Sequence, residues 1–266
     1  MGDTGRVGIR GTSAVERAFV AVLVATVLGG CVAEGSPTSG DPGAVVTEPA
    51  PTDGEPSEDT TPPSTTTAPP VVAPAGSALA ALRRLPVKGR APRTGYSRSE
   101  FGQTWADVDR NGCDTRNDIL RRDLTAVVLK PGTHGCTVLT GVLHDPYTGQ
   151  TIPFVRGVGT SLAVQIDHVV ALGDAWQKGA QSLTRDRRTA MANDPLELLA
   201  VTGAVNLQKS DGDAATWLPP RKSYRCAYVA RQVAVKTKYR LWVTAAERDA
   251  MARVLSTCPR QPLPTR

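Results

Sequence analysis

The feature that most limits what this chain can fold into is a stretch near its N-terminus that contains no basic residue. No lysine or arginine occurs between Arg17 and Arg83, and seven acidic residues lie in the same interval among many Pro, Thr, Ser and Gly residues. Such a segment has too few large apolar side chains to offset the entropy cost of ordering it. We therefore expect a disordered stalk at residues 31–75 and a folded domain at residues 76–266.

Residues 1–30 have the pattern of an export signal. Three arginines precede an apolar run of about eleven residues, which is too short to span a bilayer but matches the apolar core of a signal peptide. The run ends in Leu28-Gly29-Gly30-Cys31, which resembles a bacterial lipobox, so we expect cleavage before Cys31, lipidation of its side chain and a lipoprotein on the outer face of the cell membrane. The alternative is an ordinary signal peptide with an incidental cysteine, which would release a secreted protein.

The folded part is strongly basic. From Ala75 onward there are 28 Lys and Arg residues against 16 Asp and Glu residues, a net charge of +12, compared with +6 for the whole chain. This charge favours a polyanionic partner, of which nucleic acid is the commonest. Anionic lipid, a cell-wall polymer or a merely well-solvated surface would satisfy the same charge.

Four cysteines remain when Cys31 is set aside. Cys113, Cys136, Cys226 and Cys258 form an even set in a chain with an export signal, which favours two disulfides. Three pairings are possible. We expect the first two to pair and the last two to pair, because each pair then closes one local unit. A four-cysteine zinc site is the alternative, although the chain contains no Cys-x-x-Cys pair.

The order of apolar runs and turn residues predicts strands and helices that alternate after the stalk, and therefore an α+β domain. The expected strands cover residues 124–129, 136–143, 150–155, 162–170 and 196–201, with a hairpin turn at 145–149. The expected helices cover residues 77–85, 174–178, 184–191, 202–209, 221–239 and 244–258, and the last of them opens with a capping box.

Asp167 and His168, near the end of an expected strand, are the strongest candidates for chemistry. Hydrolysis of a phosphodiester needs a base that deprotonates water and a cation that neutralises charge on the phosphate. Adjacent side chains of an extended strand project to opposite sides, so one of the two can face a metal while the other faces water. The alternative for an isolated Asp-His pair is a buried histidine satisfied by a backbone carbonyl.

Two further motifs, Asn193-Asp194-Pro195 and Asn206-Leu207-Gln208-Lys209, follow that pair. Together they resemble the HNH, or ββα-metal (His-Me finger), endonucleases, in which two antiparallel strands and a helix close around one divalent cation. More narrowly, the chain resembles the C-terminal nuclease domain of Gmr-type modification-dependent restriction enzymes and its exported stand-alone relatives. The resemblance covers residues 85–258, including 145–149 and 217–226. It implies a ββα-metal core with an additional β-hairpin and flanking helices.

The resemblance also implies a role for each motif residue. Asp167 and Asn206 match the two metal ligands, and His168 matches the general base that activates water. Asn193 matches the residue that helps to orient this histidine, and Lys209 matches a basic position suited to a phosphate. Taken singly, Asn193 could shape a turn, Asn206 could lie on a helix surface, and Lys209 could be a charge at a helix end.

One carboxylate and one amide oxygen are hard ligands, so we expect one Mg²⁺ or Mn²⁺ ion rather than Zn²⁺. Arg221, Lys222 and Arg225 are further candidates for phosphate contacts. We expect a monomeric, exported, metal-dependent endonuclease that cuts nucleic acid, DNA rather than RNA, with little sequence preference. The alternative is a lipoprotein that binds polyanions without catalysis, for DNA uptake or at the cell wall, on a nuclease-like scaffold.

Overall fold

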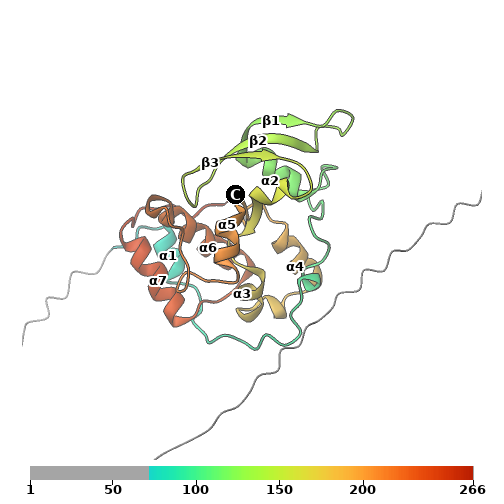
Figure 1. Ribbon diagram of the computed structural model, residues 1–266. Helices are drawn as coiled ribbons and strands as arrows, with labels where there is room; N and C mark the ends of the chain where they lie inside the picture. The colour runs from blue at the N-terminus through green and yellow to red at the C-terminus, as the bar shows by residue number, and fades with distance from the viewer. Residues whose placement is uncertain (1–71, 266) are drawn as a thin grey trace, which may run out of the picture. The chain divides into compact units, whose positions relative to one another are not determined.

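The computed structural model describes residues 72–265. The predicted signal peptide, the lipidation site Cys31 and nearly all of the predicted stalk lie outside the described residues. The predicted α+β class is confirmed (Figure 1). The strands are β1 (Leu124–Leu129), β2 (Val138–His144), β3 (Thr151–Val155), β4 (Val164–His168) and β5 (Leu198–Thr202). The α-helices are α1 (Ala78–Leu82), α2 (Thr115–Asp123), α3 (Leu172–Gln177), α4 (Arg185–Ala192), α5 (Gly203–Lys209), α6 (Arg225–Tyr239) and α7 (Ala245–Ser256).

A three-stranded antiparallel sheet in the order β1-β2-β3 forms one end of the described part (Figure 1). The predicted hairpin is confirmed, because β3 pairs along its whole length with β2. Asp145 shapes the turn between them, since its carboxylate accepts hydrogen bonds from the backbone N–H groups of Tyr147 and Thr148. The turn therefore holds Tyr147 in a defined position, where its side chain is fully buried.

Helix α2 packs against this sheet and was missed in the sequence. It has a clear start signal, because the Asp114 carboxylate accepts a hydrogen bond from the backbone N–H of Asn117 at 2.9 Å. Only Ile119 and Leu120 follow as buried apolar residues, and polar residues occupy the remaining positions. So short an apolar pattern does not reveal a helix without the sheet on which it packs.

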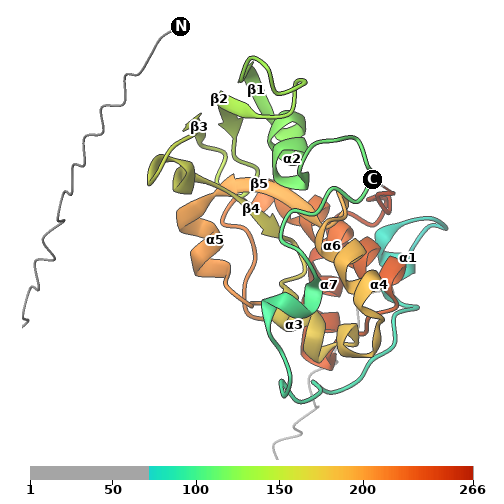
Figure 2. The same cartoon turned by 90° about the vertical axis from the view of Figure 1, so that its right-hand side faces the viewer.

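Strands β4 and β5 form an antiparallel pair that is followed directly by α5, which is the order of elements in the predicted core. Figure 2 shows this unit between the sheet with α2 and the remaining helices. Successive residues of a strand face opposite sides, and alternate residues share a side. Val164 and Ile166 therefore join the hydrophobic cluster of the sheet, whereas Leu199 and Val201 join the larger cluster of the helices.

The larger cluster is surrounded by α1, α3, α4, α6 and α7 (Figure 2).

Both predicted disulfides are confirmed, and the alternative of a four-cysteine zinc site is wrong. Cys113–Cys136 joins the segment before α2 to the segment before β2, and Cys226–Cys258 joins α6 to the residues after α7. Among residues 72–265, no helix is long and apolar enough to cross a bilayer.

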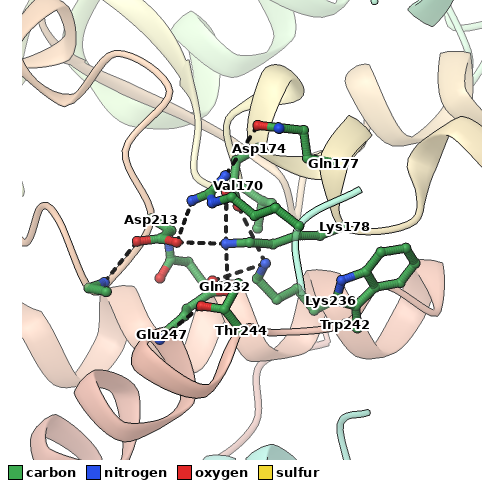
Figure 3. A network of polar contacts seen from close by, with 12 residues as sticks. Val170, Asp174, Gln177, Lys178, Asp213, Gln232, Lys236, Trp242, Thr244 and Glu247 are labelled. Carbon is green, nitrogen blue, oxygen red and sulfur yellow. Dashed lines mark hydrogen bonds and ion pairs between the residues drawn. The ribbon is translucent and has the colours of Figure 1, made fainter. Parts of the chain in front are cut away.

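Buried charges connect α3 to α6, α7 and the segment after α5 (Figure 3). This group, the core ionic cluster, consists of the buried residues Asp174, Lys178, Asp213, Lys236 and Glu247 together with Arg90, whose side chain is 36% exposed. The ammonium group of Lys178 lies 2.7 Å from each of three carboxylates and is fully buried. Helix α3 begins only a few residues after β4, so the cluster follows closely in the chain on the strand that carries Asp167 and His168.

Candidate active site

A cleft with a volume of about 410 Å³ lies beside β4 and α5. Its walls come from these two elements and from residues 98–116, which precede and enter α2. Three of the predicted site residues, Asp167, His168 and Asn206, line this cleft. Residues nearly forty positions apart in the sequence are therefore brought to one surface.

Asp167 lies on the α5 side of β4 and is 4% exposed. One carboxylate oxygen accepts a hydrogen bond from the ammonium group of Lys209 at 2.8 Å, and the other accepts one from the hydroxyl of Tyr147 at 2.5 Å. Burial, together with the charge of Asp167, raises the pKa of Tyr147 well above its usual range, so the hydroxyl keeps its proton and stays a donor. Both oxygens of Asp167 are thus held in place from behind the cleft.

His168 lies on the opposite side of β4, as the alternation of a strand predicts, and is 9% exposed. Its Nε2 atom is 3.0 Å from the carbonyl oxygen of Ala192. Burial, followed by the charge of Arg98, lowers the pKa of His168 to about 3, so the ring is neutral at physiological pH. A carbonyl oxygen can only accept, so the hydrogen is on Nε2 and Nδ1 is the basic nitrogen.

Asn193 follows Ala192 at the end of α4 and lines a small pocket behind the His168 ring. Its side-chain amide donates a hydrogen bond to the carbonyl of Thr189 at 2.9 Å, and its amide oxygen is buried without a hydrogen-bond partner among the described residues. The atom that bonds to His168 is the carbonyl oxygen of the preceding residue. The structure therefore places Asn193 beside the histidine but gives the direct contact to Ala192.

Asn206 lies on α5, and its side-chain amide donates a hydrogen bond to Gln165 at 2.8 Å. The hydrogen bond uses the nitrogen of the Asn206 amide and not its oxygen. Asn206 lines the same cleft as Asp167. Each carboxylate oxygen of Asp167 has a second lone pair beyond the hydrogen bond that it already accepts. Carboxylate and amide oxygens are ligand types that Mg²⁺ and Mn²⁺ accept, and Mg²⁺ usually keeps several waters and needs few protein ligands. No group of three or more His, Cys, Asp or Glu residues suited to a metal occurs within residues 72–265.

Lys209 is at the site but does not lie where a phosphate contact was expected. It is 2% exposed, and its ammonium group is bound to Asp167 and to the carbonyl oxygen of His168, at 2.8 and 2.7 Å. The family resemblance implied a basic position suited to a phosphate, and the alternative was a charge at the helix end that the helix dipole favours. Its position instead suits a residue that holds the strand end and balances the charge of Asp167.

The other predicted phosphate contacts do not line the cleft. Arg221 lies next to the hairpin turn, where its backbone N–H bonds to the carbonyl of Tyr147. Lys222 and Arg225 line a separate hollow beside α6 and α7. Nearness in the sequence to the motif region was therefore a poor guide to nearness in space.

Several residues at the site were not assigned by the sequence. Tyr147 belongs to the turn at residues 145–149, which is part of the family resemblance. Its position in that turn was the one signal in the sequence that could have assigned it to the site. Arg98, Trp105 and Arg116 line the cleft from a part of the chain that shares no motif with β4. The ring of Trp105 is tilted by only 15° from the imidazole of His168, with 6.1 Å between the ring centres.

Comparison with known proteins adds a family to this geometry. The model of the C-terminal domain of the GmrSD restriction endonucleases matches residues 114–254, a range that includes Asp167, His168, Asn193 and Asn206. A protein of Arthroderma benhamiae, described as an uncharacterized secreted protein, is 38% identical over 192 residues, which cover 71% of this chain and 89% of the relative. No solved structure matches this chain.

Proposed function

The chain belongs to the family of the GmrSD restriction endonuclease C-terminal domains, and on this premise we propose that it is an HNH-type, metal-dependent endonuclease that hydrolyses phosphodiester bonds outside the cell. The observation that carries the proposal is the geometry of His168. This neutral histidine, whose Nε2 is engaged by Ala192, keeps Nδ1 as a base in a cleft shared with Asp167.

In the proposed reaction, His168 accepts a proton from the attacking water through Nδ1. The carbonyl of Ala192 holds the ring in the required tautomer, and a phosphate that enters the cleft brings negative charge, which raises the pKa of His168 towards the working pH. Asp167 and Asn206 would hold the Mg²⁺ or Mn²⁺ ion, which supplies positive charge beside the phosphate when bound. Lys209 and Tyr147 keep the Asp167 carboxylate oriented.

Several finer features belong to the same proposal. The basic charge of the folded part supports a nucleic-acid substrate. The proposal names DNA rather than RNA as this substrate, cut with little sequence preference. A secreted relative and the signal pattern at residues 1–30 support export. Lipidation of Cys31 would keep the domain, as a monomer, at the outer face of the membrane.

The test is cleavage of plasmid DNA and RNA by the purified chain with Mg²⁺ or Mn²⁺. We expect the wild-type chain to cut, EDTA to stop it, and His168→Ala to reduce the rate by about a thousandfold. Arg84→Gln, which removes an exposed charge on another part of the surface, is the matched control and should cut at the wild-type rate. Full activity of His168→Ala refutes the mechanism. Tight binding of DNA without cleavage by the wild-type chain supports the alternative of a polyanion-binding protein.

A further inference from the structure

One wall of the cleft is built from residues that precede the family match. Arg98 and Trp105 line the cleft, whereas the match begins at residue 114. The segment that carries them is firmly attached. Arg188 of α4 forms an ion pair with the Glu100 carboxylate at 2.9 Å and donates to the Glu100 carbonyl at 2.7 Å, and Phe101 is 2% exposed. The wall is therefore a formed surface.

Trp105 is the aromatic residue of this wall. Its side chain is half-buried and lines both the cleft and the small pocket behind His168. Its backbone φ is +57°, which is uncommon for a residue other than glycine and persists where the surrounding structure enforces it. The backbone N–H of Thr115 donates to the Trp105 carbonyl and helps to hold this conformation. An aromatic side chain is thereby kept beside the proposed base.

Arg98 and Arg116 add positive charge to the same cleft. Among the described residues, no ion pair engages either guanidinium group, while the cleft carboxylates of Asp167 and Asp211 are paired with Lys209 and Arg93. Arg98 and His168 line the same cleft. The cleft therefore presents positive charge suited to a phosphate next to the aromatic side chain.

The catalytic groups are recessed in this cleft, because Asp167 is 4% and His168 9% exposed. In a duplex the bases are stacked inside, and the stiff helix cannot bring one of them to Trp105 unless it is flipped out. An unpaired strand can bend into the cleft and stack a base on an aromatic side chain. Leu207, which is 72% exposed on the α5 side of the cleft, offers a second apolar contact.

We propose that the cleft binds a single-stranded segment of nucleic acid, with one base stacked on Trp105 and a neighbouring phosphate bound by Arg98. This inference rests on the proposed function for the chemistry, but it assigns strandedness and two binding residues that the family match does not reach. It explains why the wall carries an aromatic residue and an arginine without an acidic partner. A polar wall alone would serve a nuclease that reads only the outside of a duplex.

Binding can be measured apart from cleavage, with fluorescently labelled oligonucleotides of about a dozen nucleotides in EDTA, a length within the usual site size of single-strand binders. Single-stranded DNA, single-stranded RNA and a duplex of the same sequence are compared, and a gel checks that each stays intact. We expect one or both single strands to bind about tenfold more tightly than the duplex. Trp105→Ala should bind single strands about tenfold more weakly than the wild-type chain, and Trp105→Phe should bind them almost as tightly as the wild-type chain.

Arg98→Gln should weaken binding of all single strands alike and reduce the slope of log affinity against log salt by about one. Arg84→Gln is the matched control, since it removes a charge of the same type outside the cleft. Trp105→Leu fills the same space without an aromatic face, so it keeps the test valid if Trp105→Ala does not fold. Wild-type affinity in a folded Trp105→Leu chain overturns the proposal, as does a duplex bound as tightly as the single strands.

The two proposals fail in different ways. A chain that binds single strands through Trp105 but never cuts them refutes the proposed function and supports this inference. A chain that cuts duplex and single strands at equal rates, with Trp105→Leu as active as wild type, supports the proposed function and overturns the inference.

Discussion

Two largely buried groups of polar residues in this protein both contain a Lys–Asp ion pair and have different roles. In the core ionic cluster, three cations face three carboxylates, and Lys178 alone contacts three of the acids (Figure 3). The second group, the site cluster, consists of Asp167, Lys209 and Tyr147, with a single ion pair between Asp167 and Lys209. The first is enclosed by helices, whereas the second borders the cleft.

The difference lies in what remains available on the acids. The three N–H donors of Lys178 all bind carboxylates inside the helical core. Lys178 therefore connects α3, the segment after α5 and α7 to one another. In the site cluster, one donor holds each oxygen of Asp167 from behind, and the cleft gives a ligand access to the carboxylate. A buried ion pair therefore acts as a structural link when it is closed and as a support for a binding group when it borders a cavity.

The largest effect should come from Lys178→Met, which breaks the core ionic cluster. It leaves three buried carboxylates without their shared cation, so we expect the free energy of unfolding to fall by about 3–5 kcal/mol. The cleavage rate per folded molecule should not change. Urea denaturation and cleavage assays measure the two quantities. Arg248→Met breaks an exposed ion pair with Asp249 and should cost less than about 1 kcal/mol.

Lys209→Met makes the matching change in the site cluster. We expect a smaller loss of stability, about 2–3 kcal/mol, because Asp167 keeps the Tyr147 hydrogen bond and borders the cleft. Cleavage should also fall, by about 10- to 100-fold, because the carboxylate loses one of the groups that orient it. Loss of stability with undiminished cleavage would mean that the two clusters do not differ in the way that we infer.

Tyr147→Phe removes one neutral donor from the site cluster. The expected cost is about 1 kcal/mol of stability and about a tenfold lower cleavage rate. Tyr239→Phe is a close control, because the Tyr239 hydroxyl donates to the Asp194 carboxylate at 2.6 Å outside the cleft. It should cost similar stability and leave cleavage unchanged. Equal cleavage by both variants contradicts a role for Tyr147 at the site.

The smallest effect is expected at Glu197, which belongs to neither cluster. It is fully buried, and one of its carboxyl oxygens accepts a hydrogen bond from the backbone N–H of Val170. Burial raises the pKa of Glu197 well above its usual 4.5. The folded chain keeps a proton there that the unfolded chain releases above pH 4.5, so this residue makes stability fall as pH rises.

Glu197→Gln removes this dependence, because an amide does not titrate. We expect the Tm at pH 8 to rise by a few degrees at most and to change little at pH 4. Thermal unfolding across that range measures it. A Tm that falls at pH 8 would mean that the ionised form of Glu197 is the one that the fold needs.

Much of the fold could be predicted from local patterns. The turn at residues 145–149, the strands on either side of it and the N-cap at Thr244 are short-range signals, and each appears in the structure. The Glu247 carboxylate, which a capping box would use at the helix start, is bound to Lys178 and Lys236 in the core ionic cluster. Both disulfides were predicted because each pairs neighbouring cysteines of the sequence. Helix α2 was missed because only two of its side chains carry an apolar signal.

The site was predicted less completely, for a physical reason. Asp167, His168 and Asn206 belong to motifs of the family, so the resemblance alone predicts that they share one site. Trp105 and Arg98 reach the same cleft only because a separate segment packs against α4, and no periodicity records that contact. The burial of Lys209 likewise depends on which neighbours surround the end of α5.

The sequence by itself determined the fold class and the disulfide pairing, because these follow from local propensity, spacing and residue type. Its motifs, through the family resemblance, predict a ββα core, a candidate base and candidate metal ligands. The tertiary structure decided the rest. It decided that Ala192 holds His168, that Lys209 serves Asp167 and that residues 98–116 complete the cleft. Hydrogen bonds and burial between distant segments depend on packing in three dimensions, and a linear pattern does not contain them.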